Sequence, residues 1–390
     1  MAINVLALDI EGGHGGSSKS LYTAIFGLDK DKVNVEVWCK RGSDLQAKYA
    51  ELGVTCKIKP NMPKVSALPQ LSRNLYSHLR FLIDFYLASE FRADLVRQIN
   101  SRFDVVHFNH ESLAGLGGWL RPKVTAKLVF HNRTMLRPSI FSRLQVRVMD
   151  SAADHLIFIT ENEQENVSKL GAASPSSVIF NPVFVYDHLD DCFEEENVEK
   201  NCFKVCCLSN FSWSRGLDRI VEVAQILKKD SQKHITFIVI GDIKLSRKLP
   251  GQLGEVARNG GDFMEYASVS GVADMFDFVG HIPNPKSLLS NCDVLVKPSR
   301  ESNPWGRDIL EAMALGKPTI SIGTYSRFIK NRKTGVLLSQ YQPRELADVI
   351  VWLSKNPAIA REMGRRAKKL VRETCSVSMA AEKLTKVWSN

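Results

Sequence analysis

The feature that most constrains the fold is an alternation of short apolar runs with amphipathic stretches, which occurs twice along the chain. Short apolar runs predict buried strands and the stretches between them predict helices, so the pattern indicates an α/β protein with parallel sheets. The first cycle predicts strands at 4–8, 33–38, 54–58, 105–108, 128–130, 156–159 and 177–180. The second predicts strands at 203–208, 236–240, 277–279, 294–297, 319–322 and 336–338, followed by helices at 344–354, 357–373 and 376–388.

The two cycles predict two domains. Residues 181–202 are acidic and lack periodicity, as a linker does. A chain of 390 residues also exceeds what one hydrophobic core usually supports. We therefore expect an N-terminal Rossmann-like domain at 1–180, a second one at 200–370, and a C-terminal helix at 371–390 that returns to the first.

Composition excludes several classes of protein. Hydrophobic residues make up 44% and charged residues 24% of the chain, which is ordinary for a globular protein. No apolar run approaches the ~20 residues that span a bilayer, and the first residues lack the basic region of a signal peptide. We expect a cytoplasmic protein with reduced cysteines. Nucleic acid is not an expected partner, because no recognition-helix or aromatic RNA-binding motif is visible.

The formal net charge of +10 is unevenly distributed. Residues 60–149 contain 13 Lys and Arg against 5 Asp and Glu, and residues 71–100 within them are dense in aromatic side chains and arginines. One interpretation is an ordinary amphipathic helix with a solvated basic face. The other is docking on an anionic membrane surface that carries a lipid-linked acceptor, because basic and aromatic side chains suit that interface. The protein would then be peripheral on the cytoplasmic face of the membrane.

Ligands of doubly wound sheets bind beyond the carboxyl ends of the strands, so the segments that follow each strand carry the candidate residues. The first strand is followed by the glycine-rich segment 12–20. It fits neither the Walker-A nor the Gly-x-Gly-x-x-Gly pattern, because Ser18 stands where each requires glycine. Glycines here let backbone N–H groups approach an anion, and a purely structural turn is the alternative.

Histidines follow two further strands. His110 follows the fourth predicted strand, and His131, Asn132 and Arg133 follow the fifth. A satisfied structural histidine is the alternative at each position, although two strand ends that deliver histidines to one sheet edge favour a ligand site. We expect no metal site, because the helical His-x-x-x-His pattern of zinc sites is missing.

In the second half, Asn210 and Arg215 follow the strand at 203–208. Arg215 precedes a predicted helix, where its guanidinium and the helix dipole would act on one anion, although a solvated surface arginine is the alternative. Residues 299–318 form a polar loop and a short helix that ends at Gly316. Glu311 lies among the apolar residues of that helix. A buried unpaired carboxylate is costly, so we expect Glu311 to cap a group or face a ligand.

In this order, the segments resemble the retaining nucleotide-sugar glycosyltransferases of family 4 (glycosyl transferases group 1), which have the GT-B fold of two facing Rossmann-like domains. The resemblance covers nearly the whole chain and is strongest from Phe203 to Leu338. Its signature segments are Pro298-Ser299, Asn303-Pro-Trp-Gly-Arg307 and Leu310-Glu-Ala-Met-Ala-Leu-Gly-Lys-Pro318. Gly15-Gly16, 104–107, His131, 181–183 and 278–280 also fit the spacing of the family.

The resemblance implies that the first domain binds the acceptor and the second the nucleotide sugar. It implies that Glu311 accepts hydrogen bonds from the ribose, that Gly15 and Gly16 approach the diphosphate, and that His131 lies by the transferred sugar. His131, Arg215, Asn303 and Glu311 are the implied catalytic residues. Further implied donor positions are Asn210, Gly280, Ile282, Trp305, Gly306, Arg307, Thr324 and Tyr325, and the implied acceptor positions are His110, Asn132 and Arg133.

Two positions depart from the family. Asn303 stands where the family usually has the first glutamate of Glu-x7-Glu, so a negative charge near the sugar is lost. Asn210 stands where the family has the arginine of an Arg and Lys pair, which leaves Arg215 as the diphosphate cation.

The resemblance implies transfer of a sugar, with retention, from a UDP- or GDP-linked donor to a saccharide or lipid-linked acceptor in cell-surface polysaccharide or glycolipid biosynthesis. No cofactor or metal is expected. Two alternatives stay open: a catalytically silent nucleotide-sugar-binding GT-B protein, motivated by Asn210 and Asn303, and a nucleotide-sugar epimerase.

Overall fold

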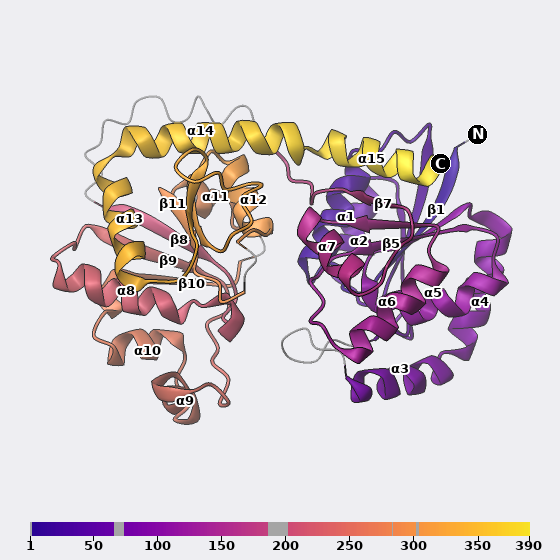
Figure 1. Cartoon of the computed structure of the whole chain (residues 1–390), viewed down its shortest axis with the longest axis horizontal. Helices are drawn as coiled ribbons and strands as arrows, with labels where there is room; N and C mark the ends of the chain where they lie inside the picture. Colours follow the sequence, from indigo (N-terminus) through magenta and orange to yellow (C-terminus); the bar gives the residue numbers. More distant parts are fainter. Residues whose placement is uncertain (1, 66–73, 186–201, 283, 302–303) are drawn as a thin grey trace. The chain divides into compact units, whose positions relative to one another are not determined.

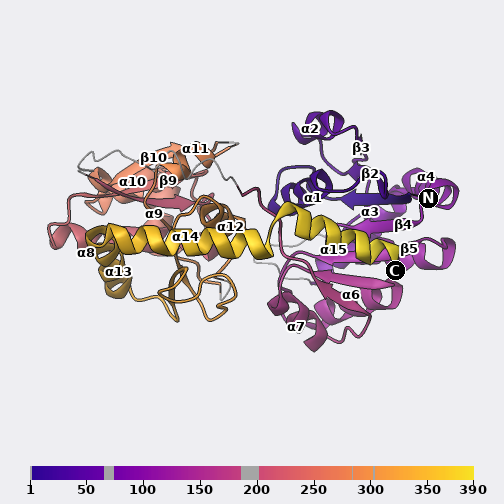
Figure 2. The same cartoon turned by 90° about the horizontal axis from the view of Figure 1, so that it is seen from above.

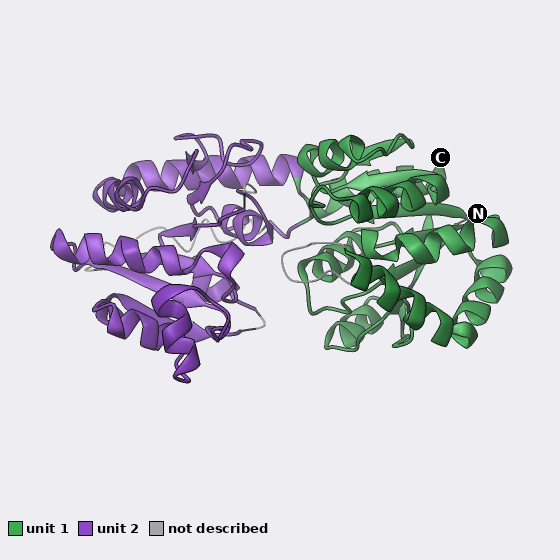
Figure 3. Ribbon diagram, turned by 60° about the horizontal axis from the view of Figure 1, so that its bottom comes forward, with its two compact units in different colours: residues 1–182, 375–390 green, residues 183–374 purple. Residues whose placement is uncertain are grey.

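The computed structural model describes residues 2–65, 74–185, 202–282, 284–301 and 304–390 (Figure 1). The chain divides into two compact units, which Figure 3 shows in different colours. Unit 1 contains Met1–Pro182 and Cys375–Asn390, and unit 2 contains Val183–Thr374. The last segment therefore belongs to unit 1, although it follows unit 2 in the sequence.

Unit 1 is built on a seven-stranded parallel sheet in the order β3-β2-β1-β4-β5-β6-β7. Its strands are β1 (Ile3–Asp9), β2 (Val33–Cys39), β3 (Thr55–Ile58), β4 (Val105–Phe108), β5 (Lys127–Asn132), β6 (His155–Phe158) and β7 (Ser176–Val178). Its α-helices are α1 (Gly16–Phe26), α2 (Leu45–Glu51), α3 (Leu75–Leu87), α4 (Ser89–Arg102), α5 (Ala114–Leu120), α6 (Ile140–Ala152), α7 (Glu161–Lys169) and α15 (Val377–Ser389).

The core of unit 1 has two layers, because successive side chains of a strand point to opposite faces of the sheet. Val5 and Ala7 of β1 join the cluster that includes Leu21 of α1 and Leu384 of α15. Leu6 and Leu8 join the opposite cluster, beneath α4, α5, α6 and α7. Figure 2 shows α15 beside α1, in agreement with the shared cluster. Both faces of the sheet are thus covered, as in a doubly wound fold.

Unit 2 repeats the plan with a six-stranded parallel sheet in the order β10-β9-β8-β11-β12-β13. Its strands are β8 (Phe203–Leu208), β9 (Ile235–Ile240), β10 (Phe276–Gly280), β11 (Val294–Lys297), β12 (Thr319–Ile322) and β13 (Gly335–Leu338). Its α-helices are α8 (Asp218–Lys229), α9 (Gly251–Arg258), α10 (Phe263–Val269), α11 (Lys286–Ser290), α12 (Arg307–Ala314), α13 (Pro343–Lys355) and α14 (Pro357–Thr374).

Every strand that the apolar runs predict is present, with ends that lie at most two residues from the predicted ones. The difference that matters for function is in β5. The sequence predicts a strand that ends at Phe130, yet β5 continues to Asn132 because pairing with β6 extends to His131↔Ile157 and Asn132↔Phe158. His131 and Asn132 are therefore strand residues, and the expectation that they follow the strand is wrong.

Candidate active site

In each unit the strand order reverses at one place, and the crevice there is where doubly wound sheets bind ligands. In unit 1 the reversal lies between β1 and β4, and in unit 2 it lies between β8 and β11. In unit 2, a small pocket opens where β8 and β11 end, and its lining includes Ser209, Arg215, Lys297 and Asp308. The predicted donor residues Arg215 and Arg307 follow these same two strands.

The loops after β8 and β11 are tied together by Arg300, which the sequence analysis did not single out. Its guanidinium donates to Asp218 Oδ1 at 2.7 Å and Oδ2 at 2.5 Å, and to the Trp213 carbonyl at 2.8 Å. It also lies 3.5 Å from the centroid of the Trp213 ring. Arg300 N donates to the Ser214 carbonyl at 2.8 Å. These contacts fix the short turn Trp213–Arg215 that carries Arg215.

Arg215 itself lies at the surface end of that turn. Within the described part of the chain, its guanidinium takes part in no hydrogen bond or ion pair, while the neighbouring Arg300 is fully engaged. Gly216 follows in the left-handed conformation, with φ of 71°, and a Cβ there would lie 2.2 Å from the Pro298 carbonyl oxygen. The glycine therefore allows the turn to approach the β11 loop. Arg215, which precedes this glycine, stays available for an anion.

A partly buried lysine supports the start of α12. Lys297, the last residue of β11, donates to the Trp305 carbonyl at 2.7 Å and pairs with Asp308 at 3.1 Å. A Cβ on Gly306 would lie 2.6 Å from Lys297 Nζ and 2.5 Å from Asp308 Oδ1. A side chain at residue 306 would therefore displace the charged end of Lys297 or Asp308. The sequence analysis missed Lys297 and Asp308, although Lys297 has the recognisable position of a charged residue that ends an apolar strand.

Glu311 of α12 is neither buried nor unpaired. Arg307, one helical turn before it, donates to Glu311 Oε1 from Nε at 3.0 Å and from Nη2 at 2.8 Å, and the Glu311 side chain is 31% exposed. Helix α12 buries Ile309, Leu310, Ala312, Met313 and Ala314 and turns Glu311 away from them, so the carboxylate does not lie in the apolar face of the helix. Both bonds from Arg307 go to Oε1, so the partly exposed carboxylate retains acceptor capacity for a ligand.

The other predicted donor positions lie at neighbouring strand ends of unit 2. Gly280 ends β10 with φ of 79°, at a register irregularity, and Ile282 follows it. Thr324 and Tyr325 follow β12. The Asn210 side chain accepts from Asp242 N at 2.8 Å, so it links the loops after β8 and β9. Asn303 lies outside the described residues.

In unit 1 the glycine-rich loop is organised by Asp9, a residue that the sequence analysis missed. Asp9 is fully buried at the end of β1 and accepts from Gly12 N at 3.0 Å, Ser18 Oγ at 2.5 Å and Asn109 Nδ2 at 3.2 Å. Gly15 and Gly16 begin α1, as a phosphate-binding loop requires.

Glu11 lies in that loop against the start of α1. Ser17 Oγ donates to its carboxylate, and a Cβ on Gly15 would lie 2.0 Å from Glu11 Oε2. A carboxylate is therefore already present beside the amides expected to meet the diphosphate.

The candidate acceptor residues of unit 1 form a buried polar cluster. Arg133 donates to Asn109 Oδ1 from Nε at 3.1 Å and to Asn181 Oδ1 from Nη1 at 2.9 Å. His110 Nδ1 accepts from Ser112 N at 3.1 Å. Asn132 Nδ2 donates to the Thr134 carbonyl at 2.8 Å. His110 and Asn132 are thus held by bonds to nearby residues, and Arg133 is held by bonds to distant parts of unit 1.

His131 differs from its neighbours. It is 3% exposed, its ring meets that of His107 edge to face at 5.4 Å, and neither ring nitrogen has a described hydrogen-bond partner. Burial, with the nearby Arg133 charge, lowers the pKa of His131 well below its usual range. The imidazole is therefore neutral near pH 7 and offers one donor and one acceptor. His107 is structural, as its position within a strand predicts, and accepts from Trp388 Nε1 at 3.3 Å.

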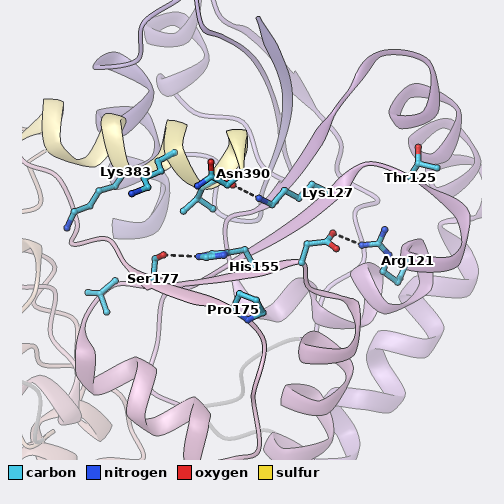
Figure 4. A pocket seen from close by; sticks show the side chains of 12 residues that line it. Arg121, Thr125, Lys127, His155, Pro175, Ser177, Lys383 and Asn390 are labelled. Carbon is cyan, nitrogen blue, oxygen red and sulfur yellow. Dashed lines mark hydrogen bonds and ion pairs between the residues drawn. The ribbon is translucent and has the colours of Figure 1, made fainter. Parts of the chain in front are cut away.

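A second, larger pocket lies at the opposite edge of the unit 1 sheet. Figure 4 shows Lys127 and His155, which begin β5 and β6, with Lys383 of α15 beside them. Lys127 donates to the Val387 carbonyl at 2.5 Å, and His155 lies 2.8 Å from Ser177 Oγ. These are amino ends of strands, so the pocket is separate from the predicted site.

Among the described residues, no cluster of three or more His, Cys, Asp or Glu side chains could hold a metal ion. The expectation that the chain contains no Asp-x-Asp triplet is wrong, because Asp29-Lys-Asp31 is one. It lies in the turn before β2, where Asp29 pairs with Lys32 at 2.9 Å. Within the same residues, no helix combines the length and apolar character needed to cross a bilayer.

Two family models match the chain, one on each half. Glycosyltransferase Family 4 matches residues 14–185, and Glycosyl transferases group 1 matches residues 190–370. The chain belongs to the family 4 glycosyltransferases. This confirms the resemblance read from the signature segments and identifies the protein as a transferase.

Named relatives are also glycosyltransferases, and a solved structure has a similar fold. The glycosyltransferase is 26% identical to the D-inositol 3-phosphate glycosyltransferase of Paenarthrobacter aurescens over 300 residues, 70% of this chain and 69% of the relative. It is 23% identical to the poly(ribitol-phosphate) alpha-N-acetylglucosaminyltransferase of Staphylococcus aureus over 174 residues, 44% of this chain and 32% of the relative. Anabaena Alr3699/HepE, crystallised with UDP-glucose, is similar with a TM-score of 0.73 at 18% identity, covering 99% of both chains. The predicted GT-B fold class, with two Rossmann-like units, is confirmed.

Proposed function

We propose that this glycosyltransferase moves a sugar from a nucleoside diphosphate donor to a saccharide or lipid-linked acceptor, with retention at the anomeric carbon. The observation that carries the proposal is that unit 2 has a cationic and an anionic side chain after the two strands where its strand order reverses. Arg215 offers an exposed side chain after β8, and Glu311 offers a partly exposed carboxylate on the helix after β11. A cation suits a diphosphate and a carboxylate accepts from ribose hydroxyls, so the two residue types suit two parts of one nucleotide.

The proposed chemistry rests on charge neutralisation. Arg215, the amides of Gly15 and Gly16, and the N-terminus of α1 would stabilise the departing diphosphate. The leaving phosphate would assist deprotonation of the acceptor hydroxyl on the same face of the sugar. His131, held neutral by burial, would hydrogen-bond the transferred sugar without adding charge. Asn303 would meet the sugar through its amide. The proposed reaction uses no cofactor and no metal.

Named relatives support the choice of substrates. The structural neighbour from Anabaena was crystallised with UDP-glucose, which supports a uridine donor and leaves a guanosine donor as the alternative. The relatives from Paenarthrobacter and Staphylococcus are named for a phosphorylated cyclitol and for a polyol-phosphate polymer. We infer an acceptor of the same broad kind, in cell-surface polysaccharide or glycolipid biosynthesis. The described cysteines are free, which supports the proposed cytoplasmic location.

A binding screen followed by a transfer assay tests this function. Nucleoside diphosphates and their sugars are screened by thermal shift, and the best donor is then incubated with saccharide and lipid-extract acceptors. The proposal predicts release of nucleoside diphosphate that depends on acceptor. Binding without release from any pair would indicate a silent binding protein, and conversion of the donor without acceptor would indicate an epimerase.

A further inference from the structure

The outward face of α3 is apolar along its whole length. Seven large side chains on this helix are exposed, with Tyr86 at 79%, Leu87 at 72% and Tyr76 at 61%. The full set is Leu75, Tyr76, Leu79, Leu82, Ile83, Tyr86 and Leu87. At 100° per residue these positions fill one continuous arc of the helix. Contiguous exposed apolar surface of this kind marks an interaction site.

The opposite face of α3 is fully occupied by unit 1. Phe81 is buried so closely against α5 that a Cβ on Gly115 would lie 2.5 Å from its ring. The Phe85 ring packs on Trp119 at 5.6 Å, and Asn74 caps the helix by accepting from Ser77 N at 3.0 Å. The helix is therefore anchored with its apolar arc outward, and the interpretation of a solvated basic face is wrong for α3.

The start of α6 extends the same surface. The rings of His78 and Phe141 lie 5.4 Å apart, which places the beginning of α6 beside α3. Ile140 and Leu144 are exposed there, at 76% and 49%. Figure 1 shows α3 at the margin of unit 1. We call the seven α3 side chains with Ile140 and Leu144 the apolar face.

Two arginines border the apolar face. Arg143 and Arg147, one helical turn apart on α6, are exposed, and neither has a carboxylate partner among the described residues. On α3 itself, Arg80 is neutralised by Asp84 at 3.1 Å. The net charge beside the apolar face is thus positive. An apolar helix face with tyrosines and bordering arginines fits the boundary between headgroups and acyl chains of an anionic bilayer.

We propose that the apolar face, with Arg143 and Arg147, docks unit 1 on an anionic lipid surface. Docking on a lipid surface is a property separate from sugar transfer, and it does not depend on which sugar donor the enzyme uses. The position of the apolar face in unit 1 suits this role, because α6 also contacts the segment of the candidate acceptor residue His110. Gln145 of α6 donates to the Glu111 carbonyl at 2.7 Å, and Glu111 follows His110 in the sequence. A lipid-linked acceptor held at the surface would therefore be close to the acceptor side.

The test is sedimentation of the full chain with vesicles of phosphatidylcholine, with and without anionic phosphatidylglycerol. Wild type is expected to bind the anionic vesicles and to bind the neutral ones much less. Arg143→Gln with Arg147→Gln is expected to weaken binding about 25-fold, because each arginine near an anionic surface contributes about fivefold. Leu82→Ser with Tyr86→Ser is expected to abolish it, since both side chains leave the aqueous phase.

The matched control is Met264→Ser with Val269→Ser, which alters two exposed apolar side chains of α10 in unit 2 and is expected to bind like wild type. All variants are checked for an unchanged unfolding midpoint and unchanged nucleotide binding. Equal binding to neutral and anionic vesicles, or none to either, would overturn the proposal. So would a wild-type dimer by light scattering that Leu82→Ser with Tyr86→Ser dissociates, because the apolar face would then be covered by a second copy.

Discussion

The substitution Glu311→Ala separates a ligand-facing carboxylate from a structural ion pair. In the structure, both described side-chain bonds of Glu311 come from Arg307, which lies on the same helix one turn earlier. The Glu311 side chain is 31% exposed and that of Arg307 is 17% exposed. A pair of this kind contributes only about 0.3–0.5 kcal/mol to folding. The unfolding midpoint should therefore fall by no more than a few degrees.

The expected effect on the donor is far larger. Hydrogen bonds to a charged group contribute roughly 1.5–3 kcal/mol each. Loss of one such bond from the ribose would weaken nucleoside diphosphate affinity by about 10- to 150-fold. Titration calorimetry with UDP and GDP measures this directly, and differential scanning calorimetry on the same samples measures the change in midpoint.

A matched control is available on α14. Glu362 accepts from Arg366, one helical turn later, at 2.6 Å and also from Arg365 at 2.8 Å, with its side chain 36% exposed. Glu362→Ala should reproduce the small loss of stability and leave nucleotide affinity unchanged. The ribose assignment would be refuted if Glu311→Ala and Glu362→Ala had the same affinity, within about threefold of wild type.

Three further changes test other parts of the site. Arg215→Ala should weaken UDP or GDP binding at least tenfold by calorimetry and leave binding of the unphosphorylated nucleoside unchanged; an equal loss for both would contradict a diphosphate role. Glu11→Gln should strengthen diphosphate binding about fivefold, because two charges at 4 Å repel by about 1 kcal/mol even in water, and unchanged or weaker binding would argue against a diphosphate at Gly15. Burial lowers the pKa of His107 to about 3. Between about pH 6.5 and pH 3 the unfolded chain therefore binds a proton that the folded chain does not bind, so the stability of the fold should decrease as the pH drops through this range. Between about pH 7 and pH 5 the unfolding midpoint of His107→Phe should fall less than that of wild type. An equal fall in both proteins would show that other groups cause the pH dependence.

The strands were predictable from the sequence where the pattern of apolar side chains marks them. Runs such as Val105–Phe108 and Val294–Lys297 are apolar on both faces, which only a covered parallel strand allows, and both have the predicted ends. The β5 end was not predictable in the same way. His131 and Asn132 are polar, and what keeps them in the strand is backbone pairing with β6, which the apolar pattern does not report.

Part of the candidate site could be placed from the sequence. Arg215 and the loop of Gly15 and Gly16 follow strand ends, as predicted, and their roles toward a donor stay predictions. The residues that hold the loops in place were missed, because their partners are distant in sequence. Asp9 meets Asn109, and Arg300 meets Asp218, only after the strands have been ordered. The partner of Glu311 was also missed, because the neighbouring apolar residues do not show that helix geometry turns Glu311 toward Arg307.

The most direct test of the proposed donor site is photoaffinity labelling with a nucleoside diphosphate sugar that carries an azide on its base. The base is proposed to lie beside Gly280 and Ile282, at the bulged end of β10. Peptide mapping by mass spectrometry should find the label within residues 276–282 in the wild-type protein. Labelling should be prevented by excess unmodified nucleotide and reduced in Arg215→Ala. A label confined to residues 2–185 would contradict a donor site in unit 2.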